Sequence, residues 1–223
     1  MHVVSEPNIL YFGTPVVLVG TTNEDESCNL APMSSAFWLG WRCILGLGSL
    51  SKTPANLIRT GECVLNLPSA DLVDAVNRLA KTTGSDPVPE HKRYKGYRFE
   101  PDKFGASGFT ADPGEIVAAP RARECPVQLE AKLEAVHGVA DNDPKFKGVI
   151  SLFEVRIVRV HLDQAILMEG APDRVDPDKW RPLIMSFQEF YGLAPDKLRP
   201  STLAEIPERL YRSPDIARAR AEA

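Results

Sequence analysis

The stretch from Asn29 to Asn66 constrains the fold more than any other, because strand-like and helix-like runs follow one another closely in it. Two apolar runs, Ser35–Leu39 and Cys43–Leu47, are separated by a turn at Gly40–Trp41 and predict two neighbouring strands. A polar loop and a helix follow, and then a third strand is expected at Cys63–Leu67. The stretch therefore predicts three strands arranged around one helix.

The start of this helix has the composition of an anion site. Thr53 is expected to be the N-cap, with Pro54 at the first helical position and Gly61 as the C-cap. Free backbone N–H groups and the helix dipole attract anions at such a start, and the nearby hydroxyls and Lys52 add donors and charge. From these features alone, a phosphate site and a well-capped helix without a ligand remain equal alternatives.

Further strands are expected on both sides of this stretch. Val16–Thr22 is short, apolar and rich in β-branched residues. Val127–Leu133 alternates apolar and polar residues, which predicts one buried and one wet face. Ser151–Leu162 changes the phase of its alternation, so a β-bulge is expected near Ile157–Val158. A short strand is expected at Gln164–Met168.

The remaining segments predict helices and loops. Ser69–Lys81 has apolar residues at helical spacing, and Thr82–Phe104 is a polar loop broken by prolines. His91, Lys92 and Arg93 in this loop form either a solvated surface run or a cationic lid over an anionic ligand.

The two ends of the chain have different characters. Residues 1–13 are expected to form an apolar arm that docks on a partner subunit. Arg181–Leu193 is aromatic-rich and is expected to pack on the main domain. A helix capped by Ser201 or Thr202 is expected at Leu203–Leu210, followed by a frayed tail after Pro214.

Charge and cysteine usage exclude several classes of function. A formal charge of −4 argues against a nucleic-acid partner. The 4 cysteines are widely spaced, without the pairs of a zinc site, and three of them are expected to be buried apolar residues. No signal peptide and no membrane-spanning run is recognisable, so no membrane association and a reducing cytoplasm are expected.

The same residues carry a family resemblance. The order N-x-A-P-x-S, then G-S-x-S-K-T-x-x-N-L, then T-G-E-x-V-x-N-L resembles the flavin reductase-like family of FMN-binding split barrels. The later segments Asp102–Phe104, Gly108–Thr110, Ala119–Pro120 and Glu124–Val127 are similar to the series D-K-F, G-L-T, A-P and E-C-P-V of that family. The resemblance covers about Thr14 to Met168.

This resemblance implies a mainly β (α+β) fold, a six-stranded antiparallel split β-barrel with a few peripheral helices. Residues 1–170 would form the FMN-binding barrel with its arm, and residues 171–223 a C-terminal extension packed on it. The implied protein is a homodimer with FMN near the subunit interface. It would transfer hydride or electrons from NADH or NADPH to flavin or another acceptor.

The resemblance also implies the residues that hold FMN. One group would face the isoalloxazine ring: Ala31, Pro32, Met33, Ser34 and Ser35, while Asn29 would bind the cofactor without an assigned part of it. The other would hold the phosphate and the ribityl chain: Ser49, Leu50, Ser51, Lys52, Thr53 and Asn56. No metal site is expected, and the catalytic residues stay unassigned, because hydride transfer between two cofactors needs placement rather than a nucleophile.

One departure from the family pattern leaves the reaction open. Many family members have a Gly-Asp-His segment associated with the nicotinamide site, whereas Ala140–Phe146 here contains no histidine. His137 and His161 lie nearby in sequence and are expected to be strand residues with local partners. Three hypotheses follow: an NAD(P)H-linked enzyme, a flavoredoxin-like FMN electron carrier, or a non-enzymatic split-barrel module that binds another anion or a haem.

Overall fold

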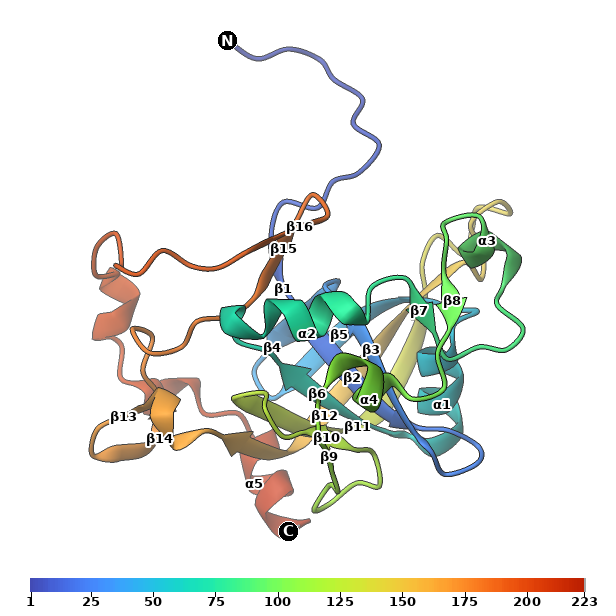
Figure 1. Ribbon diagram of the computed structural model, residues 1–223. Helices are drawn as coiled ribbons and strands as arrows, with labels where there is room; N and C mark the ends of the chain where they lie inside the picture. Colours follow the sequence, from blue (N-terminus) through green and yellow to red (C-terminus); the bar gives the residue numbers. More distant parts are fainter. Residues whose placement is uncertain (223) are drawn as a thin grey trace.

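Seven antiparallel strands form the main sheet of residues 1–222, which are the residues that the computed structural model describes (Figure 1). In sheet order they are β3 (Cys28–Met33), β2 (Val17–Thr22), β6 (Glu62–Leu67), β11 (Val127–Gly138), β12 (Ile150–Leu162), β5 (Arg42–Gly48) and β4 (Ala36–Leu39). The mainly β, antiparallel architecture is thereby confirmed. The sheet has seven strands where six were expected, and β4 corresponds to the strand expected at Ser35–Leu39.

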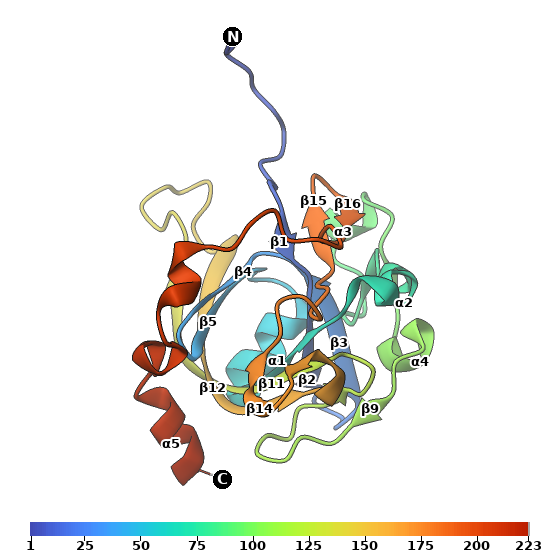
Figure 2. The same cartoon turned by 90° about the vertical axis from the view of Figure 1, so that its left-hand side faces the viewer.

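The strands at the two ends of this sheet, β3 and β4, are consecutive in the chain. Strand β3 pairs with β2 and β4 pairs with β5, and only Ser34 and Ser35 separate β3 from β4. The backbone N–H of Gly46 also donates to the carbonyl of Ser35 over 2.8 Å. Figure 2 shows the strands curving around a common centre, with α1 (Lys52–Thr60) seen in the middle of the ring in this view.

Small elements surround the main sheet. A second, three-stranded sheet consists of β1 (Thr14–Pro15), β15 (Ile184–Ser186) and β16 (Glu189–Tyr191). Three short two-stranded sheets pair β7 (Thr82–Thr83) with β8 (Arg98–Phe99), β9 (Ala111–Asp112) with β10 (Arg121–Ala122), and β13 (Leu167–Met168) with β14 (Ala171–Val175). The remaining helices are α2 (Val73–Arg78), α3 (Glu90–Arg93), α4 (Lys103–Ser107) and α5 (Asp215–Ala221). None of the helices in residues 1–222 is long and apolar enough to cross a membrane.

The interior of the curved sheet is filled by aliphatic and aromatic side chains. Leu45, Leu65, Phe153 and Val155 are each at most 1 % exposed, and Leu57 of α1 closes one end of this cluster. Burying a side chain of this size contributes about 1.5–3 kcal/mol. The expected burial of three cysteines is confirmed: Cys43 and Cys63 lie in this core and Cys125 lies in a second cluster beneath α2 and α4.

The β-bulge expected near Ile157–Val158 is confirmed. Glu130 of β11 pairs with Arg159, whereas the next residue, Ala131, pairs with Ile157, so Val158 is the extra residue. The bulge explains how both phases of the alternation in β12 remain buried, since Ile157 and Val158 are 2 % and 1 % exposed.

The expectation of a wet face on β11 holds at Glu134, which is exposed, and is wrong at Gln128 and Glu130. Gln128 is 7 % exposed and Glu130 is fully buried, because the segment between β9 and β10 covers this face. The Glu130 carboxylate accepts hydrogen bonds from the N–H groups of Glu115, Ile116 and Val117 over 2.7–3.0 Å. A polar face is therefore compatible with burial here, because fixed donors replace water.

The N-cap of α1 also differs from the expectation. Ser51, not Thr53, is the N-cap, so the helix starts at Lys52 and Pro54 is its third residue. Proline is tolerated there because the first four N–H groups of a helix have no partner within it. The C-cap is confirmed, since Gly61 has a left-handed φ of 71° and its N–H donates to the carbonyl of Leu57.

The middle of the chain is more structured than expected. The predicted helix Ser69–Lys81 is confirmed in part: a 3-10 turn, Ala70–Leu72, leads into α2, which ends at Arg78. The expected loop Thr82–Phe104 contains β7, α3 and β8, and α4 begins at its end. The expected strand Gln164–Met168 is a 3-10 turn followed by the two-residue strand β13.

Two expectations for the C-terminal region are wrong. A single helix at Leu203–Leu210 is replaced by two 3-10 turns, Thr202–Glu205 and Glu208–Tyr211, because Pro207 interrupts it; the Ser201 cap is present. The tail after Pro214 is not frayed but forms α5 against β12. Asp215 is 7 % exposed and pairs with Arg42 of β5 over 3.0 Å.

The segment Arg181–Leu193 packs on the main sheet as expected. Leu183 is 2 % exposed and its carbonyl accepts from the N–H of Val16 over 2.8 Å. The division at residue 170 into a barrel domain and an extension stays a prediction, and residue 223 lies outside the described residues.

Candidate functional site

A cavity of about 740 Å³ lies where β3, the start of α1 and the segment 79–103 meet. Eight of the twelve residues that the sequence singles out line it: Asn29, Ala31, Pro32, Met33, Ser34, Ser51, Lys52 and Thr53. Residues from both groups, the one expected to face a ring and the one expected to hold a phosphate, therefore line one cavity. Its volume is in the range of small-molecule sites, which is about 300–1,000 Å³.

The strand β3 forms one wall and is tied to α1 by buried amides. Asn29 is 1 % exposed, and its side-chain N–H donates to the hydroxyls of Thr21 over 3.0 Å and Thr53 over 3.3 Å. Asn56 of α1 donates to the same Thr21 hydroxyl over 3.1 Å. This network fixes the first turn of the helix against the strand.

The start of α1 forms the second wall. The Ser51 side chain makes no capping hydrogen bond, so it does not occupy the N–H groups of the first turn. Lys52 lines the cavity and pairs with Glu24, whose carboxyl pKa this contact lowers. An anion at this helix start would therefore compete with Glu24 for the ammonium group.

The other four residues of the predicted site do not line the cavity. Ser35 lies between β3 and β4 with its carbonyl bonded to Gly46, and the Ser49 hydroxyl is 2.9 Å from that of Ser151. Leu50 is 76 % exposed. Asn56 lies behind the helix start, where its amide N–H also donates to the side-chain oxygen of Asn23 over 2.8 Å.

The third wall comes from residues 79–103, a segment that the sequence singled out only as a possible lid carrying His91, Lys92 and Arg93. It contributes Thr82, Thr83, Gly84, Tyr97 and four lysines, Lys81, Lys92, Lys95 and Lys103. With Lys52, five ammonium groups line a cavity of a chain whose formal charge is −4. Lys103 stands in the D-K-F motif, so that motif was the available signal.

Lys103 is the most constrained of these lysines. The residue is 2 % exposed, and its ammonium group donates to the carbonyl of Leu30 in β3 over 3.4 Å. Burial, with the nearby charges of Lys92 and Arg98, lowers the pKa of Lys103 to about 8, while Glu100 acts in the opposite direction. A buried cation of this kind is costly unless a ligand supplies negative charge.

The three residues of the proposed lid, His91, Lys92 and Arg93, all lie in the short helix α3, but they do not all line the cavity. Lys92 points toward the cavity, where its ammonium group lies 3.4 Å from the Thr83 hydroxyl and 5.8 Å from the centre of the Tyr97 ring. His91 and Arg93 are exposed and do not line the cavity. Only Lys92 of the three is placed to contact a ligand there.

His137 and His161 lie near the segment that lacks the family's Gly-Asp-His, and each has a carboxylate of the neighbouring strand as its partner. His161 lies 2.7 Å from the carboxylate of Glu130, which confirms the expected local partner. His137 lies 3.7 Å from Glu154. Neither lines the cavity. Within residues 1–222, no group of three or more histidine, cysteine or acidic residues could hold a metal ion.

Comparison with known proteins places the chain in a family. The model of the flavin reductase like domain matches residues 9–194. The chain belongs to the flavin reductase like family. The uncharacterized protein YdfE of Bacillus subtilis (strain 168) is 34 % identical over 188 residues, covering 84 % of this chain and 87 % of YdfE.

Solved structures with the same fold extend over most of this flavin reductase like chain. Flavoredoxin of Desulfovibrio vulgaris (Miyazaki F) superposes with a TM-score of 0.72 and 23 % identity, covering 92 % of this chain and 100 % of flavoredoxin. A Shewanella frigidimarina NCIMB 400 structure described as having a split barrel domain superposes with a TM-score of 0.65 and 18 % identity, covering 85 % of each chain. The split-barrel fold implied by the motifs is therefore confirmed.

Proposed function

We propose that this protein is an FMN-dependent oxidoreductase that takes hydride from NADH or NADPH and passes electrons to flavin or another acceptor. The observation that carries the proposal is the single cavity in which β3, the helix start at Ser51–Thr53 and four further lysines converge. Its walls combine apolar surface with concentrated positive charge, which suits a planar ring attached to a phosphate.

The residues present fit FMN. Lys103 is a buried ammonium group with one weak protein acceptor, so a ligand with negative charge would compensate it. Gly84 leaves room on the opposite side, because a Cβ there would lie 2.8 Å from the side-chain oxygen of Asn29. A side chain at this position would occupy the space between β3 and the 79–103 wall.

Each wall of the cavity has its own role in this proposal. Ser51, Lys52 and Thr53 would hold the phosphate with hydroxyls, charge and backbone N–H groups. The β3 residues Ala31–Ser34 would line the ring with their backbone, and Lys103 would place positive charge beside it. FMN supplies the redox chemistry, and the protein supplies binding, orientation and electrostatics.

The nicotinamide nucleotide would enter beside Lys92, Lys95 and Tyr97. These residues combine two cations and an aromatic ring at the border of the cavity. Rate acceleration then rests on holding two cofactors at reacting distance, and no side chain acts as a conventional acid or base. NAD(P)H turnover is tested by stopped-flow reduction of the bound FMN with each nucleotide.

The second candidate is a flavoredoxin-like electron carrier without small-molecule turnover. Two observations favour it: the likeness to flavoredoxin, and the loop between β11 and β12, which lacks the family histidine and contributes no residue to the cavity. A protein that keeps FMN but is reduced by neither nucleotide is a carrier. A protein that does not bind FMN at all is a split-barrel module with another ligand.

We also propose that the protein is a homodimer. Residues 1–10 project away from the rest of the chain in Figure 1, while the Phe12 and Phe187 rings meet edge to face with centres 4.9 Å apart. Leu10, Tyr11 and Phe12 are 65 %, 50 % and 75 % exposed, an apolar surface that a partner subunit would cover. Light scattering at micromolar concentration tests this, and a monomeric mass would contradict it.

A further inference from the structure

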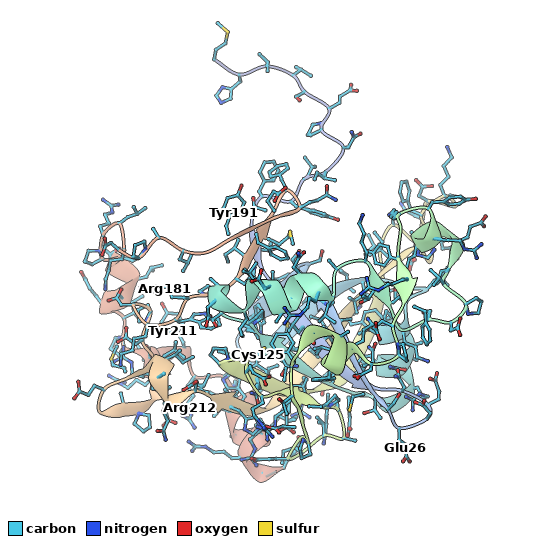
Figure 3. All side chains as sticks on the ribbon, viewed as in Figure 1. Glu26, Cys125, Arg181, Tyr191, Tyr211 and Arg212 are labelled. Carbon is cyan, nitrogen blue, oxygen red and sulfur yellow. The ribbon has the colours of Figure 1, made fainter. Side chains whose placement is uncertain are left out.

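A second groove of about 880 Å³ lies on the C-terminal side of the molecule and shares no lining residue with the first cavity. It lies between β12, β14, the 3-10 turn Glu208–Tyr211 and α5. In Figure 2 the C-terminal segment runs along one side of the main sheet down to α5, and Figure 3 places Tyr211 and Arg212 beside β14.

The floor of this groove is apolar. The half-buried Trp41, Val160 and Leu162 belong to the edge of the main core, and Ile216 of α5 adds a fourth apolar side chain. Tyr211 stands at the rim and is 62 % exposed. Such a surface can cover a flat aromatic or aliphatic body.

Arginines dominate the rim. Five arginines line the groove, Arg159, Arg174, Arg209, Arg212 and Arg220, against two carboxylates, Asp173 and Glu208. Among the described residues, Glu208 is committed to Arg174 over 2.9 Å. The rim therefore carries an excess of guanidinium groups, which bind carboxylates and phosphates in a bidentate manner.

One of these guanidinium groups is incompletely satisfied inside the protein. The Nε–H of Arg159 is buried and has no hydrogen-bond acceptor in the described part of the chain. Its only carboxylate neighbour there is Glu115, at 3.8 Å from Nη1. A buried donor without an acceptor is unfavourable, and Arg159 lines the groove, so an anion there that draws this guanidinium group toward it would supply the acceptor that the protein lacks.

We infer that this groove is a second ligand site, which binds an organic acid: a carboxylate or phosphate carried on an aromatic or aliphatic body. The arginine rim takes the acid group and the Trp41 floor takes the body. Because the two cavities share no residue, the ligand binds together with FMN and does not compete with it.

The test is titration calorimetry on the FMN-loaded protein with benzoate, phenyl phosphate, phenol and inorganic phosphate. We expect saturable binding of at least one of the two aryl acids, weakened by salt. Phenol lacks the charge and inorganic phosphate lacks the body, so each should bind about tenfold or more weakly. FMN affinity should not change when the acid is bound.

Two variants assign the site. Arg209→Gln/Arg212→Gln removes two exposed charges at the rim and leaves the core unchanged. This double variant should bind the aryl acid about tenfold or more weakly than wild type. Arg199→Gln, an exposed arginine of the same segment outside the groove, is the matched control and should bind as wild type.

Several results would overturn the inference. These are no saturable binding of either aryl acid, equal binding of inorganic phosphate, or unchanged affinity in the double variant. A fall in molecular mass of the double variant by light scattering would show instead that the groove is an interface between two copies of the chain.

Discussion

Replacing Lys103 with methionine should stabilise the empty protein and weaken its affinity for FMN. Burial lowers the pKa of Lys103 from 10.5 to about 8, so below pH 8 the folded protein holds a charge that its environment disfavours. That difference corresponds to about 3 kcal/mol. Methionine has a similar length and no charge, but it leaves the Leu30 carbonyl without its donor, which costs about 1 kcal/mol.

The expected net gain at pH 7 is therefore about 2 kcal/mol, or about 4–8 °C in Tm for a chain of this size. The gain should be complete below pH 8 and disappear as pH rises toward 10.5. In that range Lys103 is neutral in the folded wild type but still protonated in the unfolded chain, so the stability of the wild type rises with pH and approaches that of the variant. FMN affinity should fall about 10- to 150-fold, the loss of one charge-assisted contact.

Urea unfolding of the flavin-free protein and fluorescence titration with FMN measure the two effects. Lys95→Met is the control, since Lys95 lines the same cavity but is exposed, and its stability should stay within about 0.5 kcal/mol of wild type. A Lys103→Met variant that is less stable and binds FMN as tightly as wild type would refute the reasoning.

Three further predictions concern the cavity wall and the C-terminal helix. Lys52→Ala should weaken FMN binding about tenfold or more, most strongly at low salt. Glu24→Gln should tighten FMN binding, because Glu24 holds the Lys52 ammonium group in the empty protein. Titration with FMN at two salt concentrations measures both effects. Gly84→Ala should also weaken FMN binding, because the added Cβ would lie 2.8 Å from the Asn29 oxygen; a normal affinity would show that the wall can move. Asp215→Asn should lower the free energy of unfolding by about 1–3 kcal/mol at pH 7, measured in urea. Its lowered carboxyl pKa means that the wild type loses this stability as pH falls through the folded pKa, so the two proteins should converge in acid.

The strands were predictable because their periodicity is local. The phase change in β12 was enough to locate the bulge at Val158, since a side chain cannot change faces without an extra residue. The position of Gly61 at the end of α1 followed in the same way from its conformational freedom. The N-cap prediction at Thr53 was wrong, because Ser51 is an equally suitable cap and Pro54 is tolerated anywhere in the first turn.

What the sequence did not reveal depends on contacts between distant residues. Glu130 looks like a surface residue in an alternating strand, and its burial is explained only by the N–H groups of residues 115–117. The docking of α5 depends on Arg42, which lies 173 positions before Asp215. In the same way, Lys103 reaches the cavity because α4 packs on β3, and apart from the D-K-F motif and the proposed lid no local pattern indicated the lysines of residues 79–103.

The most direct test of the central claim is the absorbance spectrum of the purified protein, recorded before and after NADH or NADPH is added without air. We predict flavin absorption bands that are bleached by one of the two nucleotides, and heat-released cofactor that elutes as FMN. A colourless protein that fails to take up added FMN would contradict the account.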